Sequence, residues 1–229
     1  MRHPARRPTP LIGLAIDGKA LRGSRTADGT MIHLLAAVRH DTHTVLAQRQ
    51  IAVKSNEIGA FTPLLSGLEL SHAVITADAL HTQIEHARQI IAAGGHYIFL
   101  VKGNQPTLHR RRLKALPWRA AFLNHRTDER GHSRREIRRM KICTARPGLP
   151  FPHAAHTIQV KCRRTNRRTG TTTIATVYAI TSLPPGRIPH ARLAALIRGH
   201  WSIQALTTSA MSPTAKTPPV SGPAPHPGS

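Results

Sequence analysis

Two short apolar runs, each followed directly by an aspartate, constrain this chain more than any other feature. Residues 11–16 run into Asp17, and residues 73–77 run into Asp78. Runs of this length and composition are typical of buried strands. If the two strands lie side by side, their carboxylates face each other at the edge of a sheet. Carboxylates held so close repel each other unless a divalent cation lies between them.

Three further strands are predicted in the first half of the chain. Residues 31–39 and 44–53 are rich in Val, Leu and Ile, and a turn at residues 41–43 separates them. The apolar run at 96–101 predicts the strand that follows the one ending at Asp78. Short links between the first three strands favour an antiparallel meander.

Helices are predicted between and after the later strands. Ser55 or Asn56 can cap the first helix. A capping box that begins at Thr82 predicts the start of the second helix, and Gly94 is placed to end it. The third helix is predicted over residues 108–122.

The resulting order, β-β-β-α-β-α-β-α, defines the expected fold class. Helices between the fourth and fifth strands favour parallel crossovers added to the antiparallel meander. We therefore expect an α/β protein with a ribonuclease-H-like mixed sheet flanked by helices. In that fold the first and fourth strands are neighbours, which brings Asp17 and Asp78 together.

The remaining sequence suggests three parts. Residues 1–10 are predicted to be a disordered basic arm, residues 11–204 the folded domain, and residues 205–229 a disordered tail rich in Pro, Ser and Thr. Within the domain, residues 124–182 are predicted to be a β-rich insertion that opens with a loop. Its expected strands are 135–145, 157–163 and 173–182, and a last helix is expected at 187–203.

Charge points to a polyanionic partner. The chain has 33 Lys and Arg residues against 10 Asp and Glu residues, which gives a formal net charge of +23. Such an excess favours nucleic acid as the partner. A basic RNA-binding or ribosome-associated protein is an alternative, although an aromatic content of 3% argues against base-stacking platforms. No carboxylate side chain follows Glu136, so any catalytic acid must lie in the first 136 residues.

Cysteine usage and hydropathy favour the cytoplasm. Cys143 and Cys162 are isolated, so a structural zinc site is not expected, and a reducing compartment suits them. No stretch approaches the roughly 18–20 apolar residues that a membrane-spanning helix needs. We expect a cytoplasmic protein with no membrane partner.

Asp17 and Asp78 are the candidate catalytic and metal-binding residues. Oxygen ligands without a Cys/His cluster favour Mg²⁺ or Mn²⁺. Such ions can activate a water molecule and stabilise the leaving oxygen of a phosphodiester. The alternative is that each aspartate only caps a turn at the end of its strand. Glu57 and Glu85 fit the first turns of helices better than they fit metal ligands.

Polar and basic side chains near the strand ends are candidate DNA contacts. Lys19, Arg22 and Lys102 flank the strand ends where a phosphate backbone would lie. Asn104 and Gln105 either contact DNA or cap the helix that follows them. For the three cations the alternative is an ordinary solvated surface position.

Five motifs, in order, resemble a known family. They are Ile16-Asp-Gly-Lys-Ala-Leu-Arg-Gly-Ser24, Lys54-Ser-Asn-Glu-Ile58, Thr76-Ala-Asp-Ala79, Lys102-Gly-Asn-Gln105 and Arg198-Gly-His-Trp201. Together they resemble the insertion-sequence DDE transposases of the H-repeat-associated type. The resemblance implies a ribonuclease-H-like catalytic domain that cuts and rejoins DNA at insertion-sequence ends with Mg²⁺. A homodimer is compatible with it.

The resemblance also implies a departure at the third acid. The family's third carboxylate follows the His-Trp pair, where this chain has Gln204, and a neutral amide is a poorer metal ligand. Arg198 and His200 on the same predicted helix are candidate DNA contacts. We expect a truncated, inactive transposase remnant, because the composition changes abruptly after Gln204. The alternative is a catalytically inactive basic domain that still binds DNA.

Overall fold

The structure of the protein is a computed structural model that describes residues 10–25, 29, 31–51, 57–145, 149 and 151–210. Within these ranges, the side chains of residues 21–23, 25 and 205–210 are left undescribed. The predicted arm up to residue 9, the tail beyond residue 210, and the predicted cap residues Ser55 and Asn56 lie outside the described residues.

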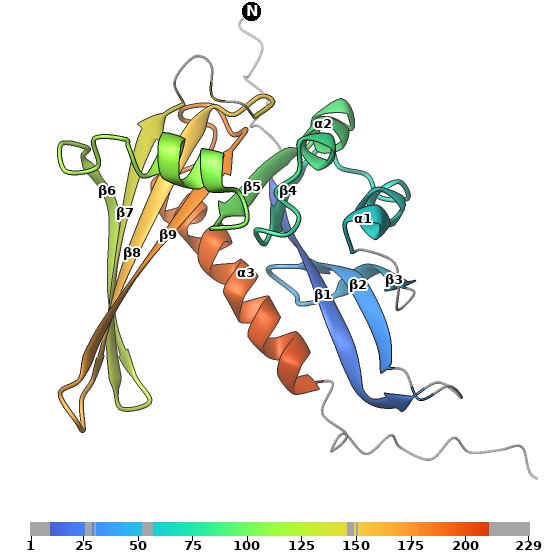
Figure 1. The fold of residues 1–229 in the computed structure, drawn as a ribbon, viewed down its shortest axis with the longest axis horizontal. Coiled ribbons are helices and arrows are strands. Elements are labelled where there is room, and N and C mark those ends of the chain that lie inside the picture. Colours follow the sequence, from blue (N-terminus) through green and yellow to red (C-terminus); the bar gives the residue numbers. More distant parts are fainter. Residues whose placement is uncertain are drawn as a thin grey trace, which may run out of the picture.

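Nine strands and a few helices make up the described chain (Figure 1). The strands are β1 (Ile12–Arg25), β2 (Met31–Arg39), β3 (Val45–Ile51), β4 (Ala73–Ala77), β5 (His96–Val101), β6 (Leu123–Gly131), β7 (Arg134–Thr144), β8 (His156–Asn166) and β9 (Thr172–Thr181). The helices are α1 (Glu57–Leu65), α2 (Ile84–Ala92), the short π-helix η1 (Thr107–Leu113) and α3 (His190–Ala210).

All nine strands belong to one sheet, in the order β3-β2-β1-β4-β5-β9-β8-β7-β6. Strands β1, β2 and β3 form an antiparallel meander, while β4 pairs in parallel with both β1 and β5. This arrangement confirms the predicted ribonuclease-H-like mixed sheet. The first and fourth strands are neighbours, as the element order predicted.

Strand β1 is longer than the apolar run that predicted it. It continues past Asp17 to Arg25, because β2 keeps pairing with it: Asp17 lies opposite Ala36, and Lys19 opposite Leu34. The prediction that Asp17 ends its strand was therefore wrong. Only the parallel pairing with β4 ends there, at Ile16 and Ala77.

The predicted β-rich insertion extends the same sheet. Strand β9 pairs antiparallel with β5, from Ile98 opposite Thr181 to Val101 opposite Tyr178. Strands β8, β7 and β6 then follow as antiparallel neighbours. The loop predicted at its start is instead strand β6, which lies at the edge of the sheet and buries too few side chains to show an apolar pattern.

The helices differ from prediction at their ends. Helix α2 begins at Ile84 without a side-chain cap, because the Thr82 hydroxyl donates to the Leu100 carbonyl oxygen, 2.5 Å away. Gly94 follows the end of α2 with a φ of 74°, which confirms its predicted place there. Helix η1 stops at Leu113, well before the predicted residue 122. Helix α3 continues to Ala210, into the region predicted to be a disordered tail.

Helices cover both faces of the sheet and divide the core between them. On one face, α1, α2 and η1 pack on β1, β4 and β5 around the aromatic residues Phe61, Tyr97 and Phe99. On the other face, α3 runs diagonally across the sheet (Figure 1) and packs on it through Leu193, Leu196 and Ile197. No helix in the described part of the chain is long and apolar enough to span a membrane.

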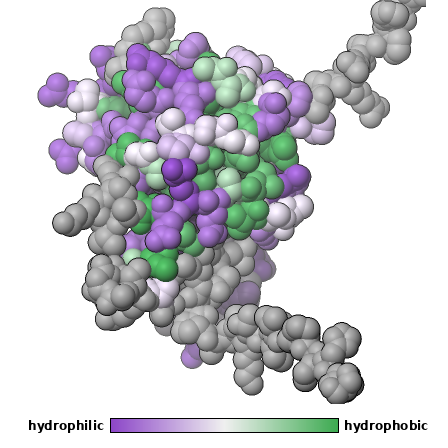
Figure 2. All heavy atoms as spheres, turned by 90° about the vertical axis from the view of Figure 1, so that its right-hand side faces the viewer, coloured by the Kyte–Doolittle hydropathy of each residue, from purple (hydrophilic) through white to green (hydrophobic). Residues whose placement is uncertain are grey.

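From the side of α1, α2 and β3, hydrophobic residues reach the surface between hydrophilic ones (Figure 2). Strand β3 is an edge of the sheet, and its Val45 and Leu46 are exposed. Their exposure fits an edge strand that helix α1 covers on one face only.

Candidate active site

Asp17 and Asp78 occupy equivalent positions on neighbouring parallel strands. Ile16 of β1 lies opposite Ala77 of β4, and each is followed directly by its aspartate. Neighbouring strands are about 4.8 Å apart, so the two carboxyl groups start from backbones that lie side by side. The juxtaposition predicted from the sequence is therefore present in the backbone.

The Asp17 carboxylate faces α3 and is only 8% exposed. Side chains alternate along a strand, and Ala15, two residues earlier, packs against Ile203 of α3. Lys19, two residues later on the same face, brings its ammonium group to 3.5 Å from Asp17 Oδ2. In this structure Lys19 therefore offsets the charge of Asp17.

Asp78 lies on a loop that other residues hold in place. Its Oδ1 accepts a hydrogen bond of 2.9 Å from the backbone N–H of Leu80. The side-chain amide of Asn104 donates to the Ala79 carbonyl oxygen, and that of Gln105 donates to the Thr82 carbonyl oxygen, each over 2.7 Å. Asn104 and Gln105, predicted to contact DNA or cap a helix, thus use these amides to fix the Asp78 loop.

Gln204 follows the residue that anchors α3 over Asp17. Ile203 is 1% exposed and packs against Ala36, the residue paired with Asp17 across the β1–β2 ladder. Helix α3 therefore carries the third-acid position to the same face and the same level of the sheet as Asp17.

Two glycines allow α3 to approach the sheet closely. A side-chain carbon on Gly199 of α3 would overlap the His40 ring, and one on Gly13 of β1 would overlap both His40 and Leu196. The His40 ring is thus wedged between the helix and the sheet. Glycine at both positions is required for the helix to reach this depth.

A buried polar cluster lies beneath the aspartates. The Thr76 hydroxyl of β4 is 2.8 Å from Nε2 of His40 and 3.3 Å from Nδ1 of His200. Burial lowers the pKa of each histidine to about 4, and neighbouring cations, including Arg192 near His40 and Lys102 near His200, act in the same direction. Both rings are therefore neutral at pH 7.

His200 does not fit its predicted role as a DNA contact. It is 1% exposed, and its Nε2 has no hydrogen-bond partner among the described residues. The negative charge of Asp78 acts against the lowering of the His200 pKa by burial. Its position on α3 makes it part of the packing that supports Asp78.

Glu57 lies on the opposite face from Asp17. Its carboxylate is packed against Gly18, whose neighbour Asp17 points the other way. His81 Nε2 is 3.6 Å from Glu57 Oε2, and hydrogen bonding to His81 lowers the pKa of Glu57. Glu57 therefore begins α1, as predicted, and lies on the face of the sheet opposite to α3.

Arg198, a predicted DNA contact on α3, belongs to a chain of ion pairs. It contacts Glu129 of β6, whose other oxygen accepts a 3.0 Å hydrogen bond from Arg138 of β7. Arg138 also contacts Glu136, which accepts a 2.6 Å hydrogen bond from Arg164 of β8. The chain ties α3 to the outer strands.

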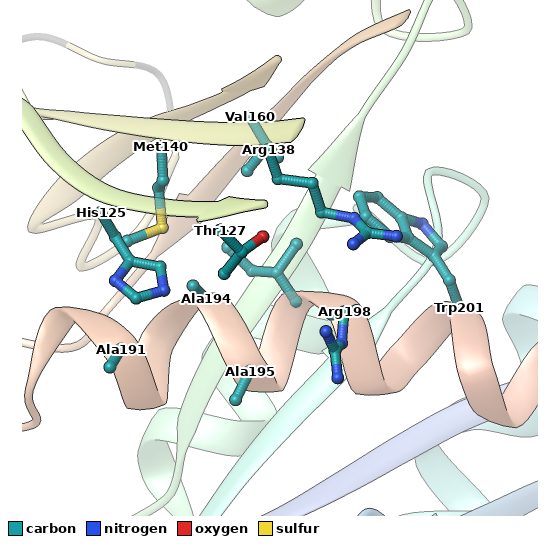
Figure 3. Close-up of a pocket in the computed structure, with 11 residues that line it drawn as sticks. His125, Thr127, Arg138, Met140, Val160, Ala191, Ala194, Ala195, Arg198 and Trp201 are labelled. Carbon is teal, nitrogen blue, oxygen red and sulfur yellow. The ribbon is translucent and has the colours of Figure 1, made fainter. Parts of the chain in front are cut away.

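A pocket of about 170 Å³ lies between α3 and the outer strands (Figure 3). Helix α3 lines it with three alanines and with the larger Ile197, Arg198 and Trp201, and Thr127, Met140 and Val160 reach it from the strands. Arg138 and Trp201 line the same pocket. The helix-facing side of these strands is therefore covered by α3, with this pocket between them.

The other predicted contacts are only partly described. Lys102 is exposed just beyond β5 and its charge acts on His200. Arg22 lies on β1, but its side chain is outside the described part of the structure. Within the described residues, no group of three or more His, Cys, Asp or Glu side chains is arranged to hold a metal ion.

A mixed sheet in which β1 and β4 are parallel neighbours, each followed by an aspartate where their pairing ends, with α3 packed across one face, defines a ribonuclease-H-like fold. The sequence matches the transposase DDE domain family over residues 8–203. The chain belongs to this family, which confirms the resemblance found in the sequence motifs.

Individual relatives cover less of the chain. It is 45% identical over 97 residues to the "Uncharacterized protein in dhlA 3'region" of Xanthobacter autotrophicus, covering 42% of this chain and 33% of that protein. It is 35% identical over 136 residues to the "H repeat-associated putative transposase YhhI" of Escherichia coli (strain K12), covering 57% of this chain and 36% of the relative. The chain thus spans about a third of the length of these two relatives.

Among solved structures, a piggyBac transposase synaptic complex with hairpin DNA aligns with a TM-score of 0.46 at 14% identity, covering 88% of this chain and 41% of that one. This similarity is too low to assign the fold, which is assigned from the strand order.

Proposed function

We propose that this chain is a transposase-derived DNA-binding domain that retains a two-carboxylate metal site but lacks strand cleavage. The observation that supports the retained site is the register of Ile16 opposite Ala77, which sets Asp17 and Asp78 side by side. The family supplies the substrate class, and the net charge of +23 suits it.

Asp17 and Asp78 would hold Mg²⁺ or Mn²⁺. Mg²⁺ is commonly bound by one or two carboxylates together with water and substrate phosphates, so this donor set fits. When bound, such an ion activates water and stabilises a leaving oxygen of a phosphodiester. Lys19, 3.5 Å from Asp17, would supply a cation at this edge of the sheet for a phosphate of the DNA backbone.

Gln204 supports the loss of cleavage. It stands at the third-acid position on α3, supplies no negative charge, and no described acid takes its place. Glu57 lies on the other face against Gly18, and Glu136 is held by Arg138 and Arg164 on the outer strands. The site therefore has two acidic ligands where the family pattern has three.

Nicking of supercoiled DNA in Mn²⁺ tests the proposal. The unmodified chain should not nick, Gln204→Glu should nick, and the double variant Gln204→Glu/Asp17→Asn should lose that activity. Nicking by the unmodified chain that Asp17→Asn abolishes would show that two carboxylates suffice, and the proposed loss of cleavage would be wrong. Failure of a folded Gln204→Glu variant to bind Mn²⁺ would refute the metal site itself.

A further inference from the structure

The outer strands β6 to β9 have a second face, turned away from α3. Met140 of β7 and Val160 of β8 are register partners, and both are buried in the cluster that contains the α3 leucines. Because side chains alternate along each strand, the next pair, Arg139 opposite Lys161, points away from α3.

The pairing register continues this face across the strands. Arg126 of β6 lies opposite Arg139, and Ile137 of β7 lies opposite Arg163 of β8, which in turn lies opposite Ile174 of β9. One row further toward the strand ends, Arg130 lies opposite Arg135. We call this surface the outer basic face; its cations are Arg126, Arg130, Arg135, Arg139, Lys161 and Arg163.

Acidic residues barely offset this charge. Asp128 is the one carboxylate that the register places on the outer basic face, and it pairs with Arg126 and Arg135. Strands β8 and β9 contain no acidic residue. Among the described residues, no carboxylate forms an ion pair with Arg139, Lys161 or Arg163, and all three are exposed.

The shape of the face suits a phosphate backbone. Cations on neighbouring strands are about 4.8 Å apart, and cations two residues apart along a strand are about 6.8 Å apart. Ile137 and Ile174 lie between them and line a shallow hollow of about 210 Å³ with Arg139, Lys161 and Arg163. Isoleucine offers no hydrogen bond to a base edge, so recognition here would follow charge and not sequence.

The face is also accessible. Helix η1 lies over the upper parts of these strands in Figure 1, whereas their lower ends, joined by the β6–β7 and β8–β9 turns, extend beyond it. Ile174 is 60% exposed. Helix α3 occupies only the opposite face (Figure 3).

We infer that the outer basic face binds the backbone of double-stranded DNA, independently of sequence and of the metal site. Charge complementarity carries this inference: six cations and one acid face outward from strands whose other side is closed by α3. It rests on the proposed function, DNA binding, and deepens it by naming the surface that carries the binding, which needs neither Asp17 nor Asp78.

The test is duplex binding in EDTA at several salt concentrations, with the triple variant Arg139→Gln/Lys161→Gln/Arg163→Gln. Each phosphate contact contributes about 0.9 to the slope of log affinity against log salt concentration. The triple variant should reduce the slope by about 2–3 and weaken binding on the order of 100-fold at 100 mM salt. Thermal unfolding checks that the variant remains folded.

A second triple variant removes the same charge elsewhere. Arg49→Gln/Arg88→Gln/Arg192→Gln changes exposed arginines of β3, α2 and α3, and it should bind DNA far better than the first. Equal binding by the two triple variants would overturn the inference. Tighter binding of duplex RNA than duplex DNA, lost in the first variant, would overturn DNA as the ligand.

The Asp17→Asn variant separates this inference from the proposed function. Its duplex binding in EDTA is compared with that of the first triple variant. If Asp17→Asn loses duplex binding while the first triple variant keeps it, DNA binds at the carboxylate edge and not on the outer basic face. If Asp17→Asn loses Mn²⁺ binding but keeps duplex binding, the result supports both the metal site and a separate DNA-binding face.

Discussion

The Thr76 hydroxyl lies 2.8 Å from Nε2 of His40, and this contact joins strand β4 to the turn after β2. The same hydroxyl reaches His200 of α3. Three elements therefore meet at one side chain, two residues before Asp78. The position of the candidate site depends on this polar cluster as well as on the sheet.

The buried histidines predict acid sensitivity. The pKa of His40 is about 4 in the folded chain, below its ordinary value of 6.5. Between pH 6.5 and about 4, His40 is protonated in the unfolded chain but not in the folded one. The free energy of unfolding is therefore at its full value above pH 6.5 and falls as the pH drops toward 4. His40 alone should contribute a slope on the order of 1 kcal/mol per pH unit in that window.

Urea unfolding between pH 4.5 and 7 measures that slope. His40→Gln should flatten the fall in the free energy of unfolding, while His72→Gln, at an exposed position, should leave it unchanged. An unchanged slope in His40→Gln would show that this ring is not the group that resists protonation.

Helix propensity and packing oppose each other at Gly199. Alanine in place of a helical glycine normally stabilises by up to about 1 kcal/mol. At Gly199 the methyl group would overlap His40, and overpacking costs about 1–3 kcal/mol. We expect Gly199→Ala to lower the free energy of unfolding.

Gly59→Ala is the matched control in α1, because no atom of the described residues lies within 4 Å of its added carbon. It should stabilise by about 0.5–1 kcal/mol. If α3 packs as closely as the structure shows, thermal or urea unfolding should show a lower free energy of unfolding for Gly199→Ala and a higher one for Gly59→Ala. Stabilisation by Gly199→Ala would contradict that packing.

The charge at residue 204 should set the affinity for Mn²⁺. Gln204→Glu adds a carboxylate on the helix that reaches the level of Asp17, and we expect binding to tighten on the order of tenfold. Calorimetric titration with Mn²⁺ measures the change. Gln159→Glu on β8 adds the same charge four strands away from β1; an equal gain there would show that the effect is general and not due to ligation.

Breaking the ion-pair chain at Glu129 should loosen α3 from the outer strands. Glu129→Gln removes its pairs with Arg138 and Arg198. Exposed pairs contribute about 0.2–1 kcal/mol each, so a loss of about 1 kcal/mol is expected in urea unfolding. Glu85→Gln breaks one exposed pair with Arg88 on α2 and should cost less; a larger loss there would argue against a special role for the chain.

Most of the correct strand predictions came from apolar runs in the sequence. Strands β2, β4 and β5 fall where such runs predict them, since their side chains are buried on both faces or nearly so. That burial, with the order of elements, sufficed to place Asp17 beside Asp78. The family motifs then predicted that Gln204 stands at the position of the third acid.

Features set by long-range contacts escaped prediction. Strand β6 has polar side chains on both faces and forms because β7 completes its hydrogen bonds. His40, outside every motif, was missed because its partners Thr76 and Gly199 are distant in sequence. Asn104 and Gln105 read as surface amides until their carbonyl partners could be seen. In the sequence, only Gly13 and Gly199 mark where α3 comes close to β1.

The two aspartates are held by different means, and this has a mechanical consequence. Asp17 lies within β1, where it and both of its chain neighbours pair with β2, whereas Asp78 lies on a loop fixed by Asn104, Gln105 and the Leu80 amide. The backbone of Asp17 is thus held by strand pairing, and that of Asp78 by side-chain hydrogen bonds from the loop that follows β5. At the proposed metal site, substitutions in the loop that follows β5 would therefore change the separation of the two carboxylates, and with it the size of the cation that fits between them.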